Sequence, residues 1–425
     1  MGRLLENHSK QLLAEHQIPV PRFYVAENET EAIEKAQALG GEVVLKALVP
    51  VGKRGKAGAI KFTTDPKSSG EAARRLFGMV VRHYPVERIL VEEKLDIDQE
   101  LFVSITLDKL ARGIAILASS AGGMDIEEIS AKYPERMKIL RVDPFRGLAD
   151  FQANQLWADL GLGGTVLRQA AGILAKLYKL FVALDCTILE INPLVITKDA
   201  KVIAAASLMA VDDCAMYRHP ELSAYVQIGS DRAWRPMTAL EKEVVQVNEA
   251  DPYRGTARYT EIDDGDIGFM CGGGGGSLMM FDTLLSYGGR PANYTEFGGN
   301  PPERKVFGLV KGILSKPGVQ GLILSANISN NTQVDVVAQG IVRALEDKGI
   351  ELQKFPVLVR FAGVNDTAAR EIFAKAGVEY YGEEISMSIA GKKMMEKMKQ
   401  AYSGSRESSG GLRCVKKEFC FGNTN

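Results

Sequence analysis

Cysteine and histidine are both scarce in this chain. Its 425 residues include five cysteines and four histidines, and no two cysteines form a C-x-x-C pair or stand at the spacing of a zinc site. Such a sparse, odd set excludes a disulfide-stapled scaffold and favours a reducing compartment. The histidines are scattered, which argues against a histidine-based metal cluster.

Excess charge of one sign and long apolar runs are also absent. Lys and Arg number 52 against 53 Asp and Glu, a formal net charge of −1. A net charge near zero gives no sign of the excess positive charge that binds nucleic acid or an anionic membrane. No apolar run approaches the roughly 20 residues of a membrane helix, and the first residues show no secretory apolar stretch. We therefore expect a cytoplasmic protein with neither nucleic-acid nor membrane partners.

Apolar residues are present in ordinary amount, and glycine is in excess. The chain is 46% hydrophobic, and at roughly 100–200 residues per domain its length predicts two to four domains. The 43 glycines are about a tenth of the chain, against a usual 7%. Glycine backbones that approach a ligand explain this excess, and tight turns between strands and helices explain it equally.

The sequence pattern changes near residue 232. Residues 1–231 mix strands with amphipathic helices, and residues 232–264 are polar with scattered prolines, so we interpret them as a linker and the entry to a second domain. Residues 265–400 form that domain, and residues 401–425 begin with a Ser- and Gly-rich stretch that predicts a flexible tail. In the first region we predict strands at 42–49, 187–196 and 201–206, and helices at 72–81 and 166–184.

The second region repeats one unit of structure, a buried-type strand followed by a loop and a helix. Three such units point to a doubly wound, mostly parallel sheet of the α/β class. The predicted strand and helix pairs are 267–271 with 277–285, 321–325 with 334–345, and 355–360 with 368–376.

The first candidate site is Lys46, at the end of a predicted strand, with the loop Gly52-Lys53-Arg54-Gly55. Fixed positive charge and approachable backbone N–H groups are what a nucleoside triphosphate requires. The loop is not a Walker A motif, because G-x-x-x-x-G-K-[ST] is not satisfied. The alternative is a solvated basic turn.

Two further candidates lie at strand ends. Glu190 and Asn192 share one face of a strand and could offer oxygen ligands to Mg²⁺, although ordinary polar residues at a strand end would look the same. Gly272, Gly274 and Ser277 nearly fit G-x-G-x-x-G between a strand and a helix, where a phosphate or merely a flexible loop could lie. The chain has no G-x-S-x-G elbow and no histidine after His219, so nucleophilic catalysis by its own residues is poorly supported.

Seven segments occur in a fixed order along the chain: KALVPVGKRGKAGAIKF (46–62), ILVEEKLDIDQELFVSI (89–105), SSAGGMDIEEI (119–129), LEINPLVITKDAKV (189–202), YRHPEL (217–222), IGFMCGGGGG (267–276) and RPANYTEFGGNPPERKV (290–306). Taken together, they resemble the β subunits of succinyl-CoA synthetase, within the ADP- or GDP-forming acyl-CoA ligase superfamily. That superfamily also includes the small subunit of ATP-citrate lyase and citryl-CoA synthetase. The similarity runs from about residue 5 to about residue 398.

The resemblance implies an N-terminal ATP-grasp domain followed by a flavodoxin-like CoA-ligase domain. It implies ATP and Mg²⁺ as cofactors, a small carboxylic acid as substrate, and a hetero-oligomer with a CoA-binding α subunit. In the family, ATP phosphorylates a histidine of that α subunit, the phosphohistidine phosphorylates the carboxylate, and CoA displaces phosphate. The lack of a histidine nucleophile in this chain agrees with such a division of labour.

The resemblance also assigns roles to single residues. Lys46 and the loop Gly52, Lys53, Arg54 and Gly55 would hold the ATP phosphates, Glu92 would lie near the hinge that recognises the base, Glu100 would contact the ribose, Asn192 would bind Mg²⁺, and Glu190 would face the partner's phosphohistidine. In the second domain the positions implied to contact substrate are Gly272, Gly273, Gly274, Asn330, Asn331 and Thr332.

Two departures from the family pattern bear on function. The family's second Mg²⁺ ligand is an aspartate fourteen residues after the asparagine, and here that position is Ala206. The segment 327–332, like 294–297, leans toward the citrate-specific members, whereas the first domain looks more like the succinate enzymes. We therefore favour a succinate-type β subunit, with citrate activation, or a nucleotide-binding paralogue impaired in turnover, as alternatives.

Overall fold

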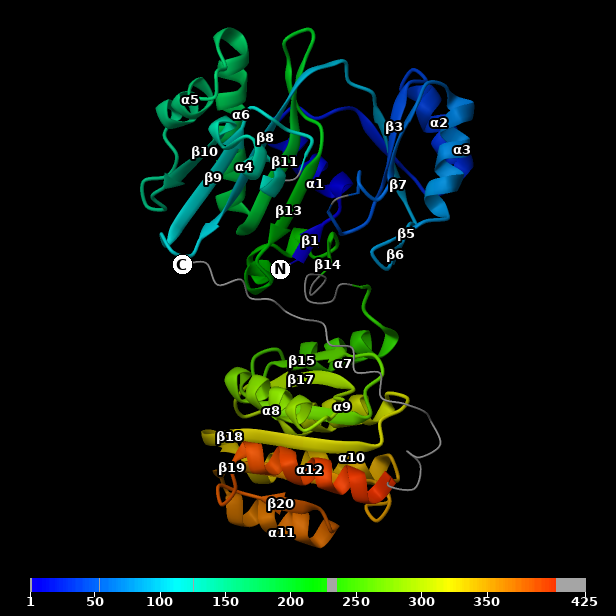
Figure 1. Ribbon diagram of the computed structural model, residues 1–425, viewed down its shortest axis with the longest axis vertical. Helices are drawn as coiled ribbons and strands as arrows, with labels where there is room; N and C mark the ends of the chain where they lie inside the picture. Colours follow the sequence, from blue (N-terminus) through cyan, green and yellow to red (C-terminus); the bar gives the residue numbers. More distant parts are fainter. Residues whose placement is uncertain (1, 53, 125, 228–234, 403–425) are drawn as a thin grey trace. The chain divides into compact units, whose positions relative to one another are not determined.

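The computed structural model describes residues 2–52, 54–124, 126–227 and 235–402. They form two compact units that divide between Pro236 and Met237 (Figure 1). None of the described helices combines the length and the apolar character needed to cross a lipid bilayer.

The larger sheet of the first unit is antiparallel, and its described strands pair in the order β10-β9-β8-β11-β13-β1-β14, with β12 beside β11. Apolar side chains of helix α6 (Gly164–Ala183), such as Leu174 and Phe181, pack with strand residues such as Leu189 in its core. Helix α5 (Asp150–Ala158) lies beside α6. The strands are β1 Gly2–Leu4, β8 Ile97–Asp108, β9 Gly113–Ser119, β10 Met137–Val142, β11 Cys186–Thr197, β12 Val202–Ala204, β13 Ser207–Val211 and β14 Val226–Gln227.

A smaller antiparallel sheet, in the order β2-β7-β3-β4, is covered by helices α2 and α3 (Figure 1). The remaining described elements of this unit are a short hairpin, two helices and three 3₁₀ turns. The bounds are β2 Phe23–Ala26, β3 Val43–Ala47, β4 Ile60–Thr63, β7 Ile89–Glu93, α2 Glu29–Ala38, α3 Pro66–Phe77, β5 Val80–Val81, β6 Tyr84–Pro85, α1 Glu6–Glu15, α4 Ile126–Lys132, and 3₁₀ turns at Pro134–Arg136, Asp213–Arg218 and Pro220–Leu222.

The helix predicted at 72–81 is shifted in the structure. Helix α3 begins at Pro66, because the Asp65 side chain and Ser68 form a reciprocal capping box and Pro66 needs no hydrogen-bond acceptor at the first helical position. It ends before Gly78, and Val80–Val81 pairs as a strand. The prediction placed the helix too late because it followed apolar spacing and overlooked the cap.

The second unit contains a mostly parallel sheet in the order β15-β17-β16-β18-β19-β20. The printed ladders are parallel except for β15 against β17. Without β15, the strands follow the flavodoxin-like order 2-1-3-4-5, which confirms the predicted doubly wound domain. The strands are β15 Ala257–Glu261, β16 Ile267–Gly272, β17 Asn293–Phe297, β18 Gly321–Gln333, β19 Val357–Val364 and β20 Glu379–Tyr381.

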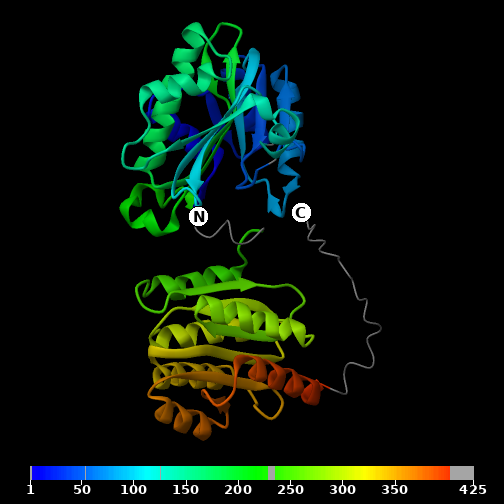
Figure 2. The ribbon, with the colours of Figure 1, turned by 60° about the vertical axis from the view of Figure 1, so that its left-hand side comes forward.

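Helices cover both faces of this sheet, so the unit has three layers (Figure 2). Successive side chains of a strand point to opposite faces of the sheet, so each strand contributes to two cores. Leu322 and Leu324 belong to the core shared with α7, α9, α10 and α11, whereas Ile323 belongs to the core shared with α8 and α12. The helices are α7 Ala239–Glu249, α8 Gly274–Ser286, α9 Glu303–Ser315, α10 Val334–Asp347, α11 Asp366–Ala376 and α12 Met387–Tyr402.

Three stretches of this unit differ from the predicted elements. The stretch 232–264, predicted as a linker and the entry to a second domain, contains α7 and β15. A capping box at Thr238 starts α7 inside a polar sequence, and β15 pairs with β17. Helix α8 begins at Gly274, so the glycine run supplies a helical turn rather than a loop. Strand β18 continues to Gln333 through backbone pairing with β19, which requires no apolar side chains. Of the tail predicted at 401–425, residues 401–402 end α12, and residues 403–425 lie outside the described residues.

Candidate functional site

A cavity of about 650 Å³ lies in the first unit, and most of the predicted nucleotide-site residues line it. They lie on β3 and the loop that follows it, on β7, and on β8 and β11. Both sheets of the first unit therefore line the cavity. The predicted residues lining the cavity are Lys46, Gly52, Arg54, Gly55, Glu92, Glu100, Glu190 and Asn192, and Ala206 lines it as well. Lys53 is outside the described residues.

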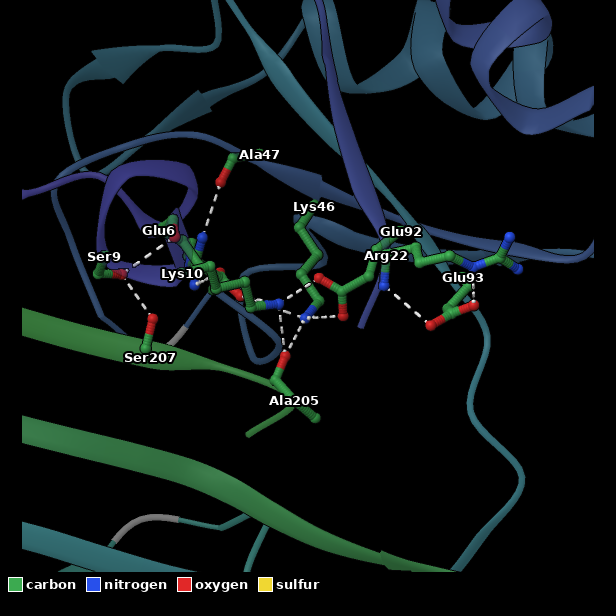
Figure 3. Close-up of polar contacts among 11 residues, drawn as sticks. Glu6, Ser9, Lys10, Arg22, Lys46, Ala47, Glu92, Glu93, Ala205 and Ser207 are labelled. Carbon is green, nitrogen blue, oxygen red and sulfur yellow. Dashed lines mark hydrogen bonds and ion pairs between the residues drawn. The ribbon is translucent and has the colours of Figure 1, made fainter. Parts of the chain in front are cut away.

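Lys46 projects from β3 into a buried network at one end of this cavity. Its side chain is 7% exposed, and its Nζ donates to Glu92 Oε1 at 2.9 Å and to the Ala205 carbonyl at 2.8 Å. Its Nζ also lies 3.2 Å from Glu6 Oε1. Figure 3 shows the Lys46 side chain between Glu92 and Ala205. The predicted phosphate-binding lysine is therefore held by protein oxygens when no anion is bound.

A second lysine uses the same acceptors. Lys10, fully buried on α1, donates from Nζ to the Ala205 carbonyl at 2.8 Å, lies 3.0 Å from Glu6 Oε1, and forms an ion pair with Glu92 Oε2. Both ammonium groups point toward the same region in Figure 3. Glu92 therefore has both carboxylate oxygens engaged by lysines, and its part in recognising the base stays a prediction.

The loop after β3 is joined to this network through Arg54. Its Nη2 pairs with Glu6 Oε2, and its Nη1 donates to the Ala47 carbonyl at 3.0 Å. The three cations Lys10, Lys46 and Arg54 outnumber the two carboxylates of Glu6 and Glu92 by one charge. The network formed by these five side chains therefore carries one net positive charge when all five are ionised.

Burial and charge act against each other on the pKa values of this network. Burial would raise the pKa of Glu6, but the charges of Arg54, Lys46 and Lys10 hold it well below its usual range. Burial would lower the pKa of Lys46, but Glu6 and Glu92 raise it. For Lys10, burial and the charge of Lys46 lower the pKa despite the same two carboxylates. Lys46 is therefore a cation at neutral pH.

Glu190, Asn192 and Ala206 lie close together in the same cavity, with Ala206 directly after Ala205 of the lysine network. The Asn192 backbone N–H donates to the Ala206 carbonyl at 3.1 Å, and all three residues line the cavity. The Asn192 side chain accepts from the Gly123 backbone N–H at 2.9 Å and donates to the Met124 carbonyl at 3.1 Å. This amide oxygen already has a protein partner.

These residues supply few ligands for a protein-held Mg²⁺. Mg²⁺ is usually anchored by one or two carboxylates together with substrate phosphates. Here Glu190 offers one carboxylate, Asn192 an oxygen already hydrogen-bonded, and Ala206 only a methyl group. Across the described ranges, no group of three or more His, Cys, Asp or Glu residues is placed to hold a metal ion. Asn192 as a metal ligand stays a prediction that requires its bond to Gly123 to be broken or shared.

Glu100, the predicted ribose contact, borders the same loop. A Cβ built on Gly123 would come within 2.1 Å of Glu100 Oε2, and Gly123 has a φ of +73°. A side chain at this position would strain the backbone, and it would require the Glu100 carboxylate to move. Glycine at 123 lets Glu100 and the loop meet beside the cavity.

In the second unit the structure gives the glycine run a packing role. A Cβ at Gly272 would lie 2.9 Å from the Ala326 Cβ and 3.0 Å from the Phe297 ring, and Gly273 has a φ of +85°. The Ser277 hydroxyl, within 2.6 Å of the Tyr294 hydroxyl, is also used inside the protein. Substrate contact by Gly272, Gly273 and Gly274 stays a prediction.

Of the other predicted substrate residues, Asn330 alone borders the second cavity, of about 380 Å³, found among the described residues. That cavity lies between the ends of β18 and β19 and is also lined by Asp366 and Glu383. Thr332 is buried, and its hydroxyl accepts from the Asn300 backbone N–H at 3.1 Å. Asn331 packs beside Gly299. Substrate contact by Asn330, Asn331 and Thr332 stays a prediction.

Comparison with known proteins assigns the chain to a family. The ATP-grasp domain family model matches residues 3–196, and the ATP citrate lyase citrate-binding model matches residues 235–397. A succinate–CoA ligase [ADP-forming] subunit beta of Ignicoccus hospitalis is 36% identical, with the match covering 89% of this chain and 95% of that protein. The chain belongs to the succinate–CoA ligase β-subunit family. A GDP-forming relative from Thermus thermophilus is 33% identical over 91% of this chain and 97% of its own length.

A solved structure supports the fold of this succinate–CoA ligase family member. ATP citrate lyase from Methanothrix soehngenii, solved with citrate and coenzyme A, matches with a TM-score of 0.77 at 20% identity, covering 93% of this chain and all of that chain. At this identity the likeness concerns the fold alone. It confirms the predicted order of an ATP-grasp domain followed by a doubly wound domain.

The sequence reasoning missed two side chains of this family member, Glu6 and Lys10. Both are buried, at positions i and i+4 of α1, and Leu13 follows on the same face. Two opposite charges on the apolar face of an amphipathic helix were a usable signal for a buried ion pair. The Ala205 carbonyl carried no such signal, because a backbone acceptor is the same at every position.

Proposed function

We propose that the chain is the nucleotide-binding β subunit of an ADP-forming acyl-CoA synthetase of the succinate type. The observation that carries this is the cavity of about 650 Å³ lined by Lys46, Arg54 and the glycine loop, in a chain of the succinate–CoA ligase β-subunit family. The cationic side chains of Lys46 and Arg54, together with the backbone of the glycine loop, suit the phosphates of a nucleotide. We place this subunit in the cytoplasm.

In this proposal the chain works with a CoA-binding α subunit that carries the reactive histidine. The γ-phosphoryl group of ATP leaves ADP and forms a bond to a ring nitrogen of that histidine, next to Glu190. The phosphohistidine then phosphorylates the carboxylate substrate, and the CoA thiol displaces phosphate to give the thioester. Positioning and charge stabilisation dominate phosphoryl transfer, and Lys46 and Arg54 supply both. Mg²⁺ arrives with ATP as part of the substrate.

Citrate activation is the second candidate, and one observation favours it. The family model that matches residues 235–397 is that of the citrate-binding region of ATP citrate lyase. Under this alternative the second unit receives citrate, and the cavity bordered by Asn330 and Asp366 is the place to look for it. The nucleotide chemistry of the first unit is the same in both candidates.

The deciding experiment combines the full-length chain with its cognate α subunit. With γ-labelled ATP, we expect acid-labile, base-stable phosphate on an α-subunit histidine, and with CoA and succinate we expect succinyl-CoA. The chain alone should form negligible thioester from ATP, CoA and either acid. Citryl-CoA in place of succinyl-CoA selects the second candidate, and robust activity of the isolated chain contradicts both.

Ala206 gives a separate prediction about turnover. Ala206→Asp adds a carboxylate beside Glu190 and Asn192. At limiting Mg²⁺ we therefore expect histidine phosphorylation in the α–β complex to rise by about tenfold, the lower end of the changes in activity that substitutions around metal sites produce. ATP binding by the unchanged chain should persist, because its phosphates meet Lys46 and the loop. The rate of labelled phosphate transfer against Mg²⁺ concentration measures this.

The matched control is Ala111→Asp, which adds the same charge in the exposed turn between β8 and β9, away from the cavity lining. It should leave the Mg²⁺ dependence unchanged. If the unaltered chain already transfers phosphate at ordinary ligase rates and Ala206→Asp brings no gain, then the alanine at position 206 has not cost the protein a needed Mg²⁺ ligand, and this prediction is wrong.

A further inference from the structure

Lys10 has no part in the proposed chemistry, yet its side chain is the most completely buried of the three cations in the network. Its side chain is 0% exposed, and it does not line the cavity, whereas Lys46 does. Burying an ammonium group this completely is unfavourable unless it is paired with carboxylates and hydrogen-bonded. The groups that Lys10 contacts indicate its role.

The two lysines contact the same three groups. Glu6 Oε1 lies 3.0 Å from Lys10 Nζ and 3.2 Å from Lys46 Nζ. The Ala205 carbonyl accepts from each at 2.8 Å. Glu92 receives Lys10 on Oε2 and Lys46 on Oε1. An ammonium has three protons, so each lysine alone can satisfy all three groups.

This duplication has a consequence for Lys46. A lysine that binds phosphate has to turn at least one proton away from its present acceptors, and a buried acceptor left without a donor is unfavourable. Because Lys10 stays beside Glu6 Oε1, Glu92 Oε2 and the Ala205 carbonyl, Lys46 can turn while each of these three groups keeps a cationic partner, and only Glu92 Oε1 gives up the donor it has now. Lys10 also neutralises one of the two carboxylates that compete with phosphate for Lys46.

We propose that Lys10 is a positioning residue that holds Glu6, Glu92 and the Ala205 carbonyl so that Lys46 is released to the phosphates of a bound nucleotide. This inference rests on the proposed nucleotide function of the cavity and adds a residue to it. Lys10 acts only through Lys46 and does not itself reach the ligand.

Calorimetric titration of the full-length chain with ATP tests this. Lys10→Met keeps the length of the side chain and removes its charge, so Lys46 alone must serve both carboxylates, and we expect the Kd for ATP to rise about tenfold. In the charge-balanced variant Lys10→Met/Glu6→Gln, one competing carboxylate is neutral, and we expect the Kd to return to within about threefold of the unaltered chain. A purely structural lysine would give no such rescue, because a second buried change would add to the first.

The matched control is Lys305→Met. Lys305 is 1% exposed in the second unit, and its Nζ donates to the Asp251 and Arg254 carbonyls and to Asn248. Losing it should lower thermal stability without changing the Kd for ATP. A crystal structure of the unaltered chain with ATP gives a reading that needs no variant to fold: Lys46 Nζ should have moved to phosphate while Lys10 keeps Glu6 and Ala205.

The outcomes are distinct. An unaltered chain that binds no ATP overturns the proposed function and this inference together. A chain that binds ATP while Lys10→Met binds it equally well, or while the double variant is weaker than the single one, overturns the inference alone. So does an ATP complex in which Lys46 keeps all its present partners or Lys10 leaves its own.

Discussion

Replacing Lys46 with alanine should weaken ATP binding by the full-length chain about ten- to a hundredfold. A charge-assisted hydrogen bond contributes about 1.5–3 kcal/mol, and each 1.4 kcal/mol is a factor of ten in affinity. Lys46 is the cation best placed for this, because it is buried, lines the cavity, and is kept charged by Glu6 and Glu92. Calorimetric titration with ATP measures the change.

The matched control for this prediction is Lys61→Ala. Lys61 lies on β4, directly beside Leu45 in the ladder with β3, and it does not line the cavity. Its removal should leave ATP affinity unchanged. If Lys46→Ala binds ATP as tightly as the unaltered chain while remaining folded, the nucleotide binds elsewhere and the proposed site is wrong.

Glu6→Ala should lower the free energy of unfolding by about 3–5 kcal/mol, the range measured when one partner of a buried ion pair is removed. Glu6 is 3% exposed and faces Lys10, Lys46 and Arg54. Without it, three buried or half-buried cations share the single carboxylate of Glu92. Urea unfolding followed by circular dichroism gives the difference.

The effect of Glu6 depends on pH in a definite direction. Its pKa in the folded chain is well below the usual 4.5, so its stabilising contribution is complete above about 4.5 and is lost as pH falls through the depressed value. The stability gap between the unaltered chain and Glu6→Ala should therefore be constant from neutral pH down to about 5 and narrow below it. A gap that narrows between pH 8 and 6 contradicts the assignment to Glu6.

A surface carboxylate provides the comparison. Glu42 is 59% exposed and lies 3.0 Å from Lys94, also at the surface. Exposed pairs contribute little because solvent and salt screen them. Glu42→Ala should accordingly change stability far less than Glu6→Ala. Equal losses in the two variants would mean that burial of the network has no special energetic weight.

Much of the second unit could be predicted from residue patterns. Short apolar runs such as Ile267–Cys271 and Phe355–Arg360, each followed by a loop and an amphipathic helix, are sufficient to predict parallel strands with crossover helices. The exposed end of β18 escaped prediction because its pairing to β19 uses backbone groups, and its side chains include Asn330 and Asn331. The start of α3 was missed because the cap at Asp65 lies ahead of the apolar positions.

The nucleotide site divides in the same way. Lys46 and the glycine loop could be found from the sequence, since a charged residue in an apolar strand before a cationic loop is a local pattern. Glu6, Lys10 and the Ala205 carbonyl could not be joined to Lys46, because they approach it from 40, 36 and 159 positions away along the chain. Local periodicity holds no information about such pairings.

The sequence by itself therefore determined the α/β class, the two-domain order and the family, because these follow from local periodicity and from motifs in a fixed order. Tertiary structure alone decided which acceptors Lys46 binds, and that Asn192 contacts the Gly123 loop. It also decided that Ala205, rather than a side chain, completes the buried network. The physical reason is that packing of separate elements brings these groups within hydrogen-bonding distance, and burial there makes every unpaired charge costly.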